Sequence, residues 1–135
     1  MAADFAERVL IVDDEAHIRT YLRLILHELG AKEIYEAGDS PNALLLYQQQ
    51  QPELVLLDFN LPGEDGLQIL ERLLKFDPHA AVVMMTAVAS REVVEQCAAS
   101  GALNYIRKDT PREGIAKALR ETWATLEETD GEQPA

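Results

Sequence analysis

Residues 54–66 read LVLLDFNLPGEDG, and this stretch decides the fold class. Residues 54–57 are apolar without interruption before Asp58, which is typical of a strand buried on both faces of a parallel sheet. Residues 60–65 combine Asn, Pro, Gly and Asp and predict a turn. The leucine and isoleucine residues of 67–74 then recur at helical spacing. The stretch therefore predicts a strand, a turn and a helix in succession.

The same alternation of strand and helix patterns continues along the chain. Short apolar runs predict strands at residues 8–12, 54–58, 81–85 and 103–106, and an alternating pattern predicts a fifth at residues 32–37. Helical spacing predicts five helices: residues 18–29, residues 41–50, one from residue 67 that ends near residue 77, one after Ser90, and one that begins at Pro111. Such a chain forms a parallel sheet with helices on both faces. We therefore predict an α/β, flavodoxin-like fold, a doubly wound five-stranded parallel sheet in the order 2-1-3-4-5 with five helices.

Length, charge and cysteine content narrow the class of protein. The chain has 135 residues, 47% of them apolar, so we expect one domain at residues 6–126 and an acidic, frayed tail at 127–135. The net charge of −12 repels phosphate backbones and anionic lipid, which argues against direct nucleic-acid binding. The single Cys97 cannot form a disulfide within the chain, and no apolar run approaches the ~20 residues that span a bilayer. These features predict a soluble cytoplasmic protein without membrane insertion.

Charged and polar residues stand at the ends of four predicted strands. The first strand ends at Asp13 and Asp14, the third at Asp58, the fourth at Thr86, and the fifth runs into Arg107 and Lys108. In an open parallel sheet, ligands bind at the carboxyl ends of the strands, where the strand order reverses. In the order 2-1-3-4-5 this point lies between strands 1 and 3, so three carboxylates should converge in one crevice.

Converging carboxylates repel one another, and proteins relieve this repulsion by raising a pKa or by binding a cation. A small set of oxygen ligands open to solvent suits Mg²⁺, or Mn²⁺, better than zinc. Such a metal can also bind a phosphoryl group, with Thr86 and Lys108 contacting the remaining phosphoryl oxygens. Asp58 stands alone at the end of the central strand, so it is the candidate nucleophile for an aspartyl-phosphate.

Each of these residues also has a simpler explanation. Asp13 and Asp14 precede a helix, where acidic residues are common, and Asp58 precedes a turn. Thr86 is a frequent strand residue, and a lone Lys108 is usually a surface charge. None of these explanations accounts for successive strand ends that carry the groups one phosphoryl-transfer reaction needs. The joint pattern therefore favours a phosphoryl-binding site.

Four motifs carry a resemblance to a known family: VLIVDDE at 9–15, LVLLDFNLPGEDG at 54–66, MMTA at 84–87 and NYIRKD at 104–109. Over about residues 8–126, the chain resembles a receiver domain of the two-component response-regulator family, close to the single-domain chemotaxis type. The four motifs together are highly specific, whereas any one of them alone is not.

The resemblance implies a role for each matching residue. Asp58 would be the phosphoacceptor and a metal ligand, Asp14 a direct ligand of Mg²⁺, Asp13 a ligand through water, and Asn60 a ligand through its backbone carbonyl. Thr86 and Lys108 would bind phosphoryl oxygens, and Tyr105 would be the switch aromatic that responds to Thr86. The protein would not be an enzyme in the usual sense, although it would assist its own phosphorylation and dephosphorylation.

Two classes of partner follow from the same resemblance. A histidine kinase or a histidine phosphotransfer protein would donate the phosphoryl group. A downstream protein target would bind the face formed by the fourth helix, the fifth strand and the fifth helix. Because no output domain follows in the sequence, we expect the readout to be a protein contact or onward phosphotransfer.

Two positions depart from the family pattern. Leu61 stands where many members have Met, a volume-conserving change of little consequence. Asp109 follows Lys108 where the family usually has Pro after a cis peptide bond. Because a cis bond before a non-proline residue costs about 2.5–4 kcal/mol, we predict a trans Lys108–Asp109 bond. We also expect the Asp109 carboxylate to lie beside the ammonium of Lys108 and to leave Lys108 less fixed.

Three other functions compete with this interpretation. A Mg²⁺-dependent phosphohydrolase usually carries its aspartyl nucleophile after the first strand with a second Asp two residues on, a position that is Glu15 here. A flavodoxin-like nucleotide carrier needs a phosphate loop rich in Gly, Ser or Thr after strand 1, and none follows. A phosphorylation-independent adaptor would carry an incomplete pocket. Turnover of phosphate esters, a bound flavin, or failure to become phosphorylated would identify these three in turn.

Overall fold

A computed structural model describes residues 5–87 and 90–132 of the chain. Within these residues the main sheet has five parallel strands in the order β2-β1-β3-β6-β7, which is 2-1-3-4-5 in chain order. The strands are β1 (Arg8–Val12), β2 (Glu33–Ala37), β3 (Leu54–Asp58), β6 (Val82–Thr86) and β7 (Asn104–Arg107). The predicted fold class and strand order are confirmed.

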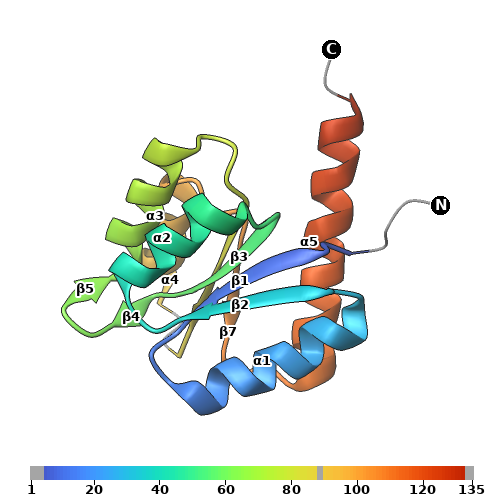
Figure 1. Ribbon diagram of the computed structural model, residues 1–135, viewed down its shortest axis with the longest axis horizontal. Coiled ribbons are helices and arrows are strands. Elements are labelled where there is room, and N and C mark those ends of the chain that lie inside the picture. Colours follow the sequence, from blue (N-terminus) through green and yellow to red (C-terminus); the bar gives the residue numbers. More distant parts are fainter. Residues whose placement is uncertain (1–4, 88–89, 133–135) are drawn as a thin grey trace.

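Five helices in the described part of the chain cover the two faces of this sheet (Figure 1). The helices are α1 (Ala16–Leu29), α2 (Ser40–Gln50), α3 (Gly66–Phe76), α4 (Arg91–Ala99) and α5 (Arg112–Glu132). The helices α1 and α5 pack on one face and α2, α3 and α4 on the other, so the sheet is doubly wound as predicted. Among the described residues, no helix is long and apolar enough to cross a membrane.

The central strand β3 contacts two separate cores, which explains its continuous apolar sequence. Leu54 and Leu56 lie in the core beneath α1 and α5. Val55 and Leu57 lie in the core beneath α2, α3 and α4. A shift of one residue in the register of β3 would draw the carboxylate of Asp58 into apolar surroundings, at a large cost. The two cores therefore fix Asp58 at the edge of the sheet.

The structure differs from the predicted elements in two places. Residues 60–65, predicted as a turn, contain an antiparallel hairpin of β4 (Asn60–Leu61) and β5 (Glu64–Asp65). Strands of two residues are too short to produce a periodic pattern. The second difference is α5, which continues to Glu132, whereas a frayed end was predicted after residue 126. Glutamate is a good helix former, and extending an existing helix adds one hydrogen bond per residue.

The boundary between a domain at 6–126 and a tail at 127–135 stays a prediction, and the last three residues of that tail lie outside the described residues.

Candidate functional site

Three carboxylates meet at the carboxyl edge of the sheet. Asp13 directly follows β1, and Asp58 is the last residue of β3, the strand paired with β1. One carboxylate oxygen from each of Asp13, Asp14 and Asp58 lies within 4.8 Å of the others. Asp13 and Asp58 are buried, with 1% and 3% of their surface exposed, whereas Asp14 is exposed. The predicted convergence of these three residues, called the acidic cluster below, is confirmed.

The ammonium of Lys108 lies between the two buried acids. Its Nζ is 2.7 Å from Asp13 Oδ2 and 3.1 Å from Asp58 Oδ2, and the side chain is only 12% exposed. Glu15 lies at the edge of this contact, with Oε1 3.9 Å from the same nitrogen. The backbone of Lys108 is held as well, because its N–H donates to the carbonyl oxygen of Thr86 at 2.7 Å.

The expectation that Lys108 is loosely held is therefore wrong. The Lys108–Asp109 peptide bond is trans, as predicted. The carboxylate of Asp109, however, contacts Arg107 Nη2 at 2.6 Å, so it does not compete for the ammonium of Lys108. Two carboxylates buried side by side need a counter-charge, and this requirement outweighs the change in the loop.

Both burial and the neighbouring charges shift the pKa values of Asp58 and Lys108. Burial raises the pKa of Asp58, and repulsion from Asp13 adds to the increase. The N–H of Asn60, which donates to Asp58 Oδ1 at 3.1 Å, and the ammonium of Lys108 offset this only in part. Burial by itself would lower the pKa of Lys108, but the hydrogen bonds to Asp13 and Asp58 outweigh it and the pKa is raised. Lys108 therefore stays charged next to an acid whose ionisation is costly.

The donor set of the acidic cluster fits a hard divalent cation. Three ionised carboxylates and one ammonium leave an excess of two negative charges, which is the charge of one such ion. All ligand atoms are oxygens, and the exposure of Asp14 leaves room for the waters that Mg²⁺ retains. Among the described residues, no His or Cys belongs to this group, which argues against zinc. The carbonyl of Asn60 as a further ligand stays a prediction.

Replacing Asp58 by Asn should stabilise the metal-free fold at neutral pH. Folding raises the pKa of Asp58, so the native state binds its proton more tightly than the unfolded chain, and stability is lost as pH rises through that pKa. The gain of Asp58→Asn over wild type should therefore be present at neutral pH. It should vanish well below the ordinary Asp pKa of about 3.9, where the wild-type carboxyl is also neutral.

Urea unfolding in the presence of a chelator, repeated across this pH range, measures the difference in free energy. Asp109→Asn is the matched control, because within the described residues the exposed carboxylate of Asp109 contacts Arg107 and lies outside the acidic cluster. This variant should leave the pH profile unchanged. A gain of Asp58→Asn that grew toward acid pH would contradict the assigned direction of the pKa shift.

A glycine allows α3 to begin against the end of β3. The N–H of Gly66 donates to the carbonyl oxygen of Phe59 at 2.6 Å. A Cβ at this position would lie 2.6 Å from the carbonyl oxygen of Asp58 and 2.7 Å from the Cα of Phe59. Both of these neighbours are backbone atoms that cannot rotate away. The close approach requires glycine and braces the segment that carries Asp58.

We expect Gly66→Ala to destabilise the fold by about 1–3 kcal/mol, the cost of overpacking a tight site. The added methyl should also push the backbone at Asp58 aside, and this displacement should weaken binding of Mg²⁺. Urea unfolding and a Mg²⁺ titration measure the two effects. Gly114→Ala is the control, because among the described residues its added methyl would meet a side-chain atom, Cγ2 of Thr110, and no backbone atom. Equal stability of Gly66→Ala and wild type would contradict the bracing role.

Thr86 and Tyr105 lie on neighbouring strands and on the same face of the sheet. Thr86 is the fully buried last residue of β6, and Tyr105 of β7 is paired in register with Met84, two residues before Thr86. Side chains two residues apart in a strand share a face, so both lie on the side of α2, α3 and α4. Tyr105 is half-buried against that core. The roles of both residues as a switch stay predictions.

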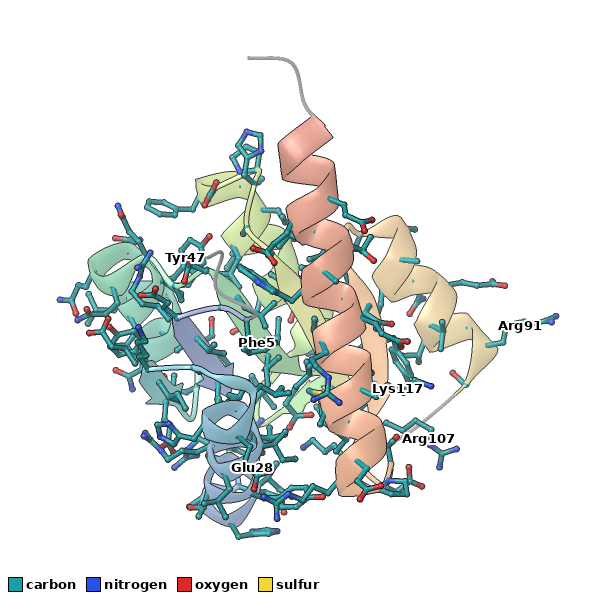
Figure 2. All side chains as sticks on the ribbon, turned by 90° about the vertical axis from the view of Figure 1, so that its right-hand side faces the viewer. Phe5, Glu28, Tyr47, Arg91, Arg107 and Lys117 are labelled. Carbon is teal, nitrogen blue, oxygen red and sulfur yellow. The ribbon has the colours of Figure 1, made fainter. Side chains whose placement is uncertain are left out.

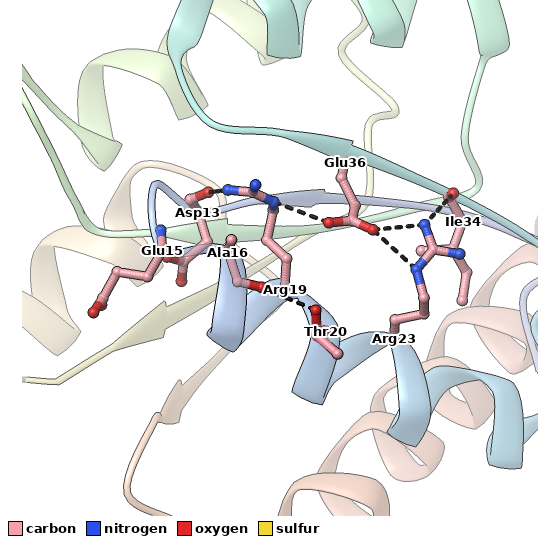
Figure 3. Close-up of polar contacts among 8 residues, drawn as sticks. All are labelled: Asp13, Glu15, Ala16, Arg19, Thr20, Arg23, Ile34 and Glu36. Atoms are coloured by element: carbon pink, nitrogen blue, oxygen red, sulfur yellow. Dashed lines mark hydrogen bonds and ion pairs between the residues drawn. The ribbon is translucent and has the colours of Figure 1, made fainter.

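Three charged residues near the cluster, Arg19, Arg23 and Glu36, were not predicted from the sequence. Arg19 and Arg23 of α1 both contact the carboxylate of Glu36 on β2 (Figure 3). The arginines stand four residues apart and so share one side of the helix. That spacing was visible in the sequence, but their acidic partner depends on how α1 packs over β2.

The chain is similar to known proteins over most of its length. The family model described as "Response regulator receiver domain" matches residues 9–120. Sporulation initiation phosphotransferase F of Bacillus subtilis (strain 168) is 33% identical over 117 residues, which cover 84% of this chain and 94% of that protein.

Two solved structures are similar in fold and sequence. A CheY-like response regulator receiver domain protein from Methanospirillum hungatei JF-1 has a TM-score of 0.82 and 28% identity, and the match covers 91% of this chain and 98% of that one. The CheX–CheY–BeF3–Mg complex from Borrelia burgdorferi matches with a TM-score of 0.79 and 30% identity, over 88% of each chain.

Proposed function

Because this chain belongs to the family of response regulator receiver domains, we propose that Asp58 accepts a phosphoryl group from a histidine kinase or a histidine phosphotransfer protein in a Mg²⁺-dependent reaction. The observation that carries the proposal is the placement of the Asp58 carboxylate. It is buried at the end of β3, 3.1 Å from the Lys108 ammonium, and clustered with the acids that would hold the metal. Signalling through a phosphoacceptor, as opposed to turnover of a separate substrate, is what the family implies.

In the proposed reaction an oxygen of Asp58 attacks the phosphorus of a phosphohistidine. The new O–P bond forms as the N–P bond breaks, and the leaving imidazole takes up a proton. Lys108 keeps its charge because of its raised pKa, and it neutralises charge on the phosphoryl oxygens. Asp13, Asp14 and Asp58 would hold Mg²⁺, which supplies further positive charge to the same oxygens. The hydroxyl of Thr86 is the proposed donor to another phosphoryl oxygen.

Support for the metal comes from the structure and from one of its relatives. The acidic cluster carries the excess charge and the oxygen donors that a hard divalent ion needs. The similar Borrelia structure contains Mg²⁺ and BeF3. We propose Mg²⁺ for this chain, with Mn²⁺ as an alternative ion of the same ligand preference.

We further propose that phosphorylation draws the Thr86 hydroxyl toward Asp58 and leaves space that Tyr105 fills. The change would alter the face formed by α4, β7 and α5, to which a downstream protein binds. Arg91, Arg107 and Lys117 come from these three elements and lie exposed on one side of the molecule (Figure 2). The similar CheY of Borrelia burgdorferi was solved with a protein partner, CheX. A cytoplasmic location, expected from the sequence, is part of the same proposal.

Acetyl phosphate tests the proposal without the unknown kinase. Wild-type protein with acetyl phosphate and Mg²⁺ should gain one phosphoryl group, stable in acid and labile in base, as measured by intact-mass spectrometry. The adduct should not form with a chelator, and it should decay once the phosphoryl donor is removed, because the protein assists its own dephosphorylation. Failure to form any adduct in Mg²⁺ or Mn²⁺ would overturn the proposal and favour the adaptor without phosphorylation.

A further inference from the structure

The guanidinium of Arg19 connects helix α1 to the main chain of the acidic cluster. Its Nη1 donates to the backbone carbonyl oxygen of Asp13 at 2.5 Å, and its Nε donates to Glu36 Oε1 at 2.9 Å. The other oxygen of Glu36 accepts from Arg23 Nε at 2.9 Å and Nη2 at 2.6 Å. Arg19, Arg23 and Glu36 are called the Arg19 bracket below, and Figure 3 displays them with Asp13 between α1, β2 and the end of β1.

With the bond from the Arg19 bracket, the carbonyl oxygen, the N–H and the side chain of Asp13 all form hydrogen bonds. The N–H of Asp13 donates to the carbonyl oxygen of Ala37 at 3.0 Å, and the N–H of Glu15 donates to Asp13 Oδ1 at 2.9 Å. With the bond from Arg19, both polar groups of the Asp13 main chain are held. The plane of the peptide between Asp13 and Asp14 is therefore set by Arg19.

Asp14 depends on this peptide more than its two neighbours in the cluster do. Asp13 and Asp58 are buried and contact Lys108. Asp14 is exposed, and its carboxylate has no hydrogen bond or ion pair with any residue in the described ranges. The orientation of the Asp14 carboxylate is consequently determined by the backbone at Asp14. A rotation of the Asp13–Asp14 peptide would move this carboxylate away from the others.

We propose that Arg19 is a positioning residue for the divalent cation: it holds the Asp13–Asp14 peptide so that the Asp14 carboxylate faces Asp13 and Asp58. The inference rests on the proposed Mg²⁺ site and adds a residue that touches neither metal nor phosphoryl group. Arginine suits this role because its planar fork donates to two acceptors in fixed directions, which the single ammonium of lysine does not.

Glu36 keeps the fork of Arg19 in place. Burial alone would raise the pKa of Glu36, but the hydrogen bonds from Arg23 and Arg19 outweigh it and lower the pKa. The carboxylate therefore stays ionised and holds both arginines. Arg23 contacts Glu36 and the carbonyl oxygen of Ile34 but not Asp13, so it shares the ion pair without the contact to the cluster.

Electrostatic repulsion between Arg19 and the cation, and positioning by Arg19, predict opposite changes in Mg²⁺ affinity when Arg19 is removed. A positive charge near a cation site repels the cation, so losing it would strengthen Mg²⁺ binding if charge alone mattered. Losing the hydrogen bond to Asp13 would free the peptide and weaken Mg²⁺ binding. The direction of the change in Kd therefore separates the two explanations.

The experiment is a Mg²⁺ titration of the full chain, followed by NMR shifts of the backbone amides, for wild type, Arg19→Met, Arg23→Met and Arg19→Lys. We expect Arg19→Met to weaken Mg²⁺ binding about tenfold, the usual scale for losing a hydrogen bond behind a metal ligand. Arg19→Lys should stay weakened, because the charge remains but the fork is lost. Arg23→Met should lose similar folding stability in urea and yet bind Mg²⁺ like wild type.

Three results would overturn the inference: tighter or unchanged binding in Arg19→Met, equal weakening in Arg23→Met, or a wild type that binds no Mg²⁺. The wild type is also incubated with acetyl phosphate in a parallel experiment. That experiment tests the proposed function independently of the role of Arg19. If Mg²⁺ binding depends on Arg19 as proposed but the wild type gains no phosphoryl group, the proposed function alone is refuted. A labelled wild type with an indifferent Arg19→Met would refute the positioning role alone.

Discussion

Replacing Asp58 by Asn is expected to abolish the phosphoryl adduct that wild type gains from acetyl phosphate and Mg²⁺. The amide has nearly the same shape as the carboxylate, so the end of β3 should keep its conformation. It is neutral, however, and is a far weaker nucleophile than the ionised carboxylate. Intact-mass spectrometry after incubation measures the loss, which should be complete at this site.

Asp109→Asn is the matched control for this variant. Its carboxylate also follows a strand at the same edge of the sheet, but it contacts Arg107 outside the acidic cluster. The control should therefore be labelled like wild type. Stoichiometric labelling of Asp58→Asn at another residue would show that Asp58 is not the phosphoacceptor.

Replacing Lys108 by Met is expected to lower the free energy of unfolding by about 3 kcal/mol in the presence of a chelator. The side chains of Asp13 and Asp58 are 2% and 3% exposed, and the ammonium of Lys108 contacts both. Without it, two buried carboxylates face each other with no counter-charge. Urea unfolding measures the loss, and Met preserves the unbranched shape of the side chain.

Mg²⁺ should restore part of this stability. A cation that binds only the native state adds about 2.7 kcal/mol at a concentration one hundred times its Kd. The gain should be larger in Lys108→Met than in wild type, because no ammonium competes for the same oxygens. Lys117→Met is the control, since Lys117 is exposed and has no ion pair within the described residues. An equal loss in the two variants, or no response of Lys108→Met to Mg²⁺, would contradict the counter-ion role of Lys108.

The strands β1, β3 and β6 could be predicted to within about one residue because burial on both faces leaves a nearly unbroken apolar run. The edge strand β2 was placed as closely by its alternating pattern. The hairpin at 60–65 could not be predicted, since its two-residue strands are held by local backbone bonds and need no apolar pattern. The end of α5 was also misplaced. Residues 127–132 carry no apolar side chain, and a sequence rule based on an apolar face does not detect such a helical end.

The acidic cluster could be predicted for a topological reason. Once β1 and β3 are neighbours and parallel, the residues that follow them must meet, whatever the details of packing. The contact of Lys108 with Asp13 and Asp58 was mispredicted from the Asp109 substitution alone. The path of that loop depends on an ion pair between Arg107 and Asp109 and on the need of two buried acids for a positive charge.

The sequence by itself determined which residues end the strands, because hydrophobic periodicity is local and is read directly from residue order. It thereby determined the fold class, the edge of the sheet at which the carboxylates meet, and the place of Asp58 at the end of the central strand. Only the tertiary structure decided which charges are buried and which backbone groups they hold. The bond from Arg19 to the carbonyl of Asp13 and its anchor on Glu36 join α1 to two different strands. Hydrogen bonds act only within about 3 Å, so they exist only after helix and sheet have packed.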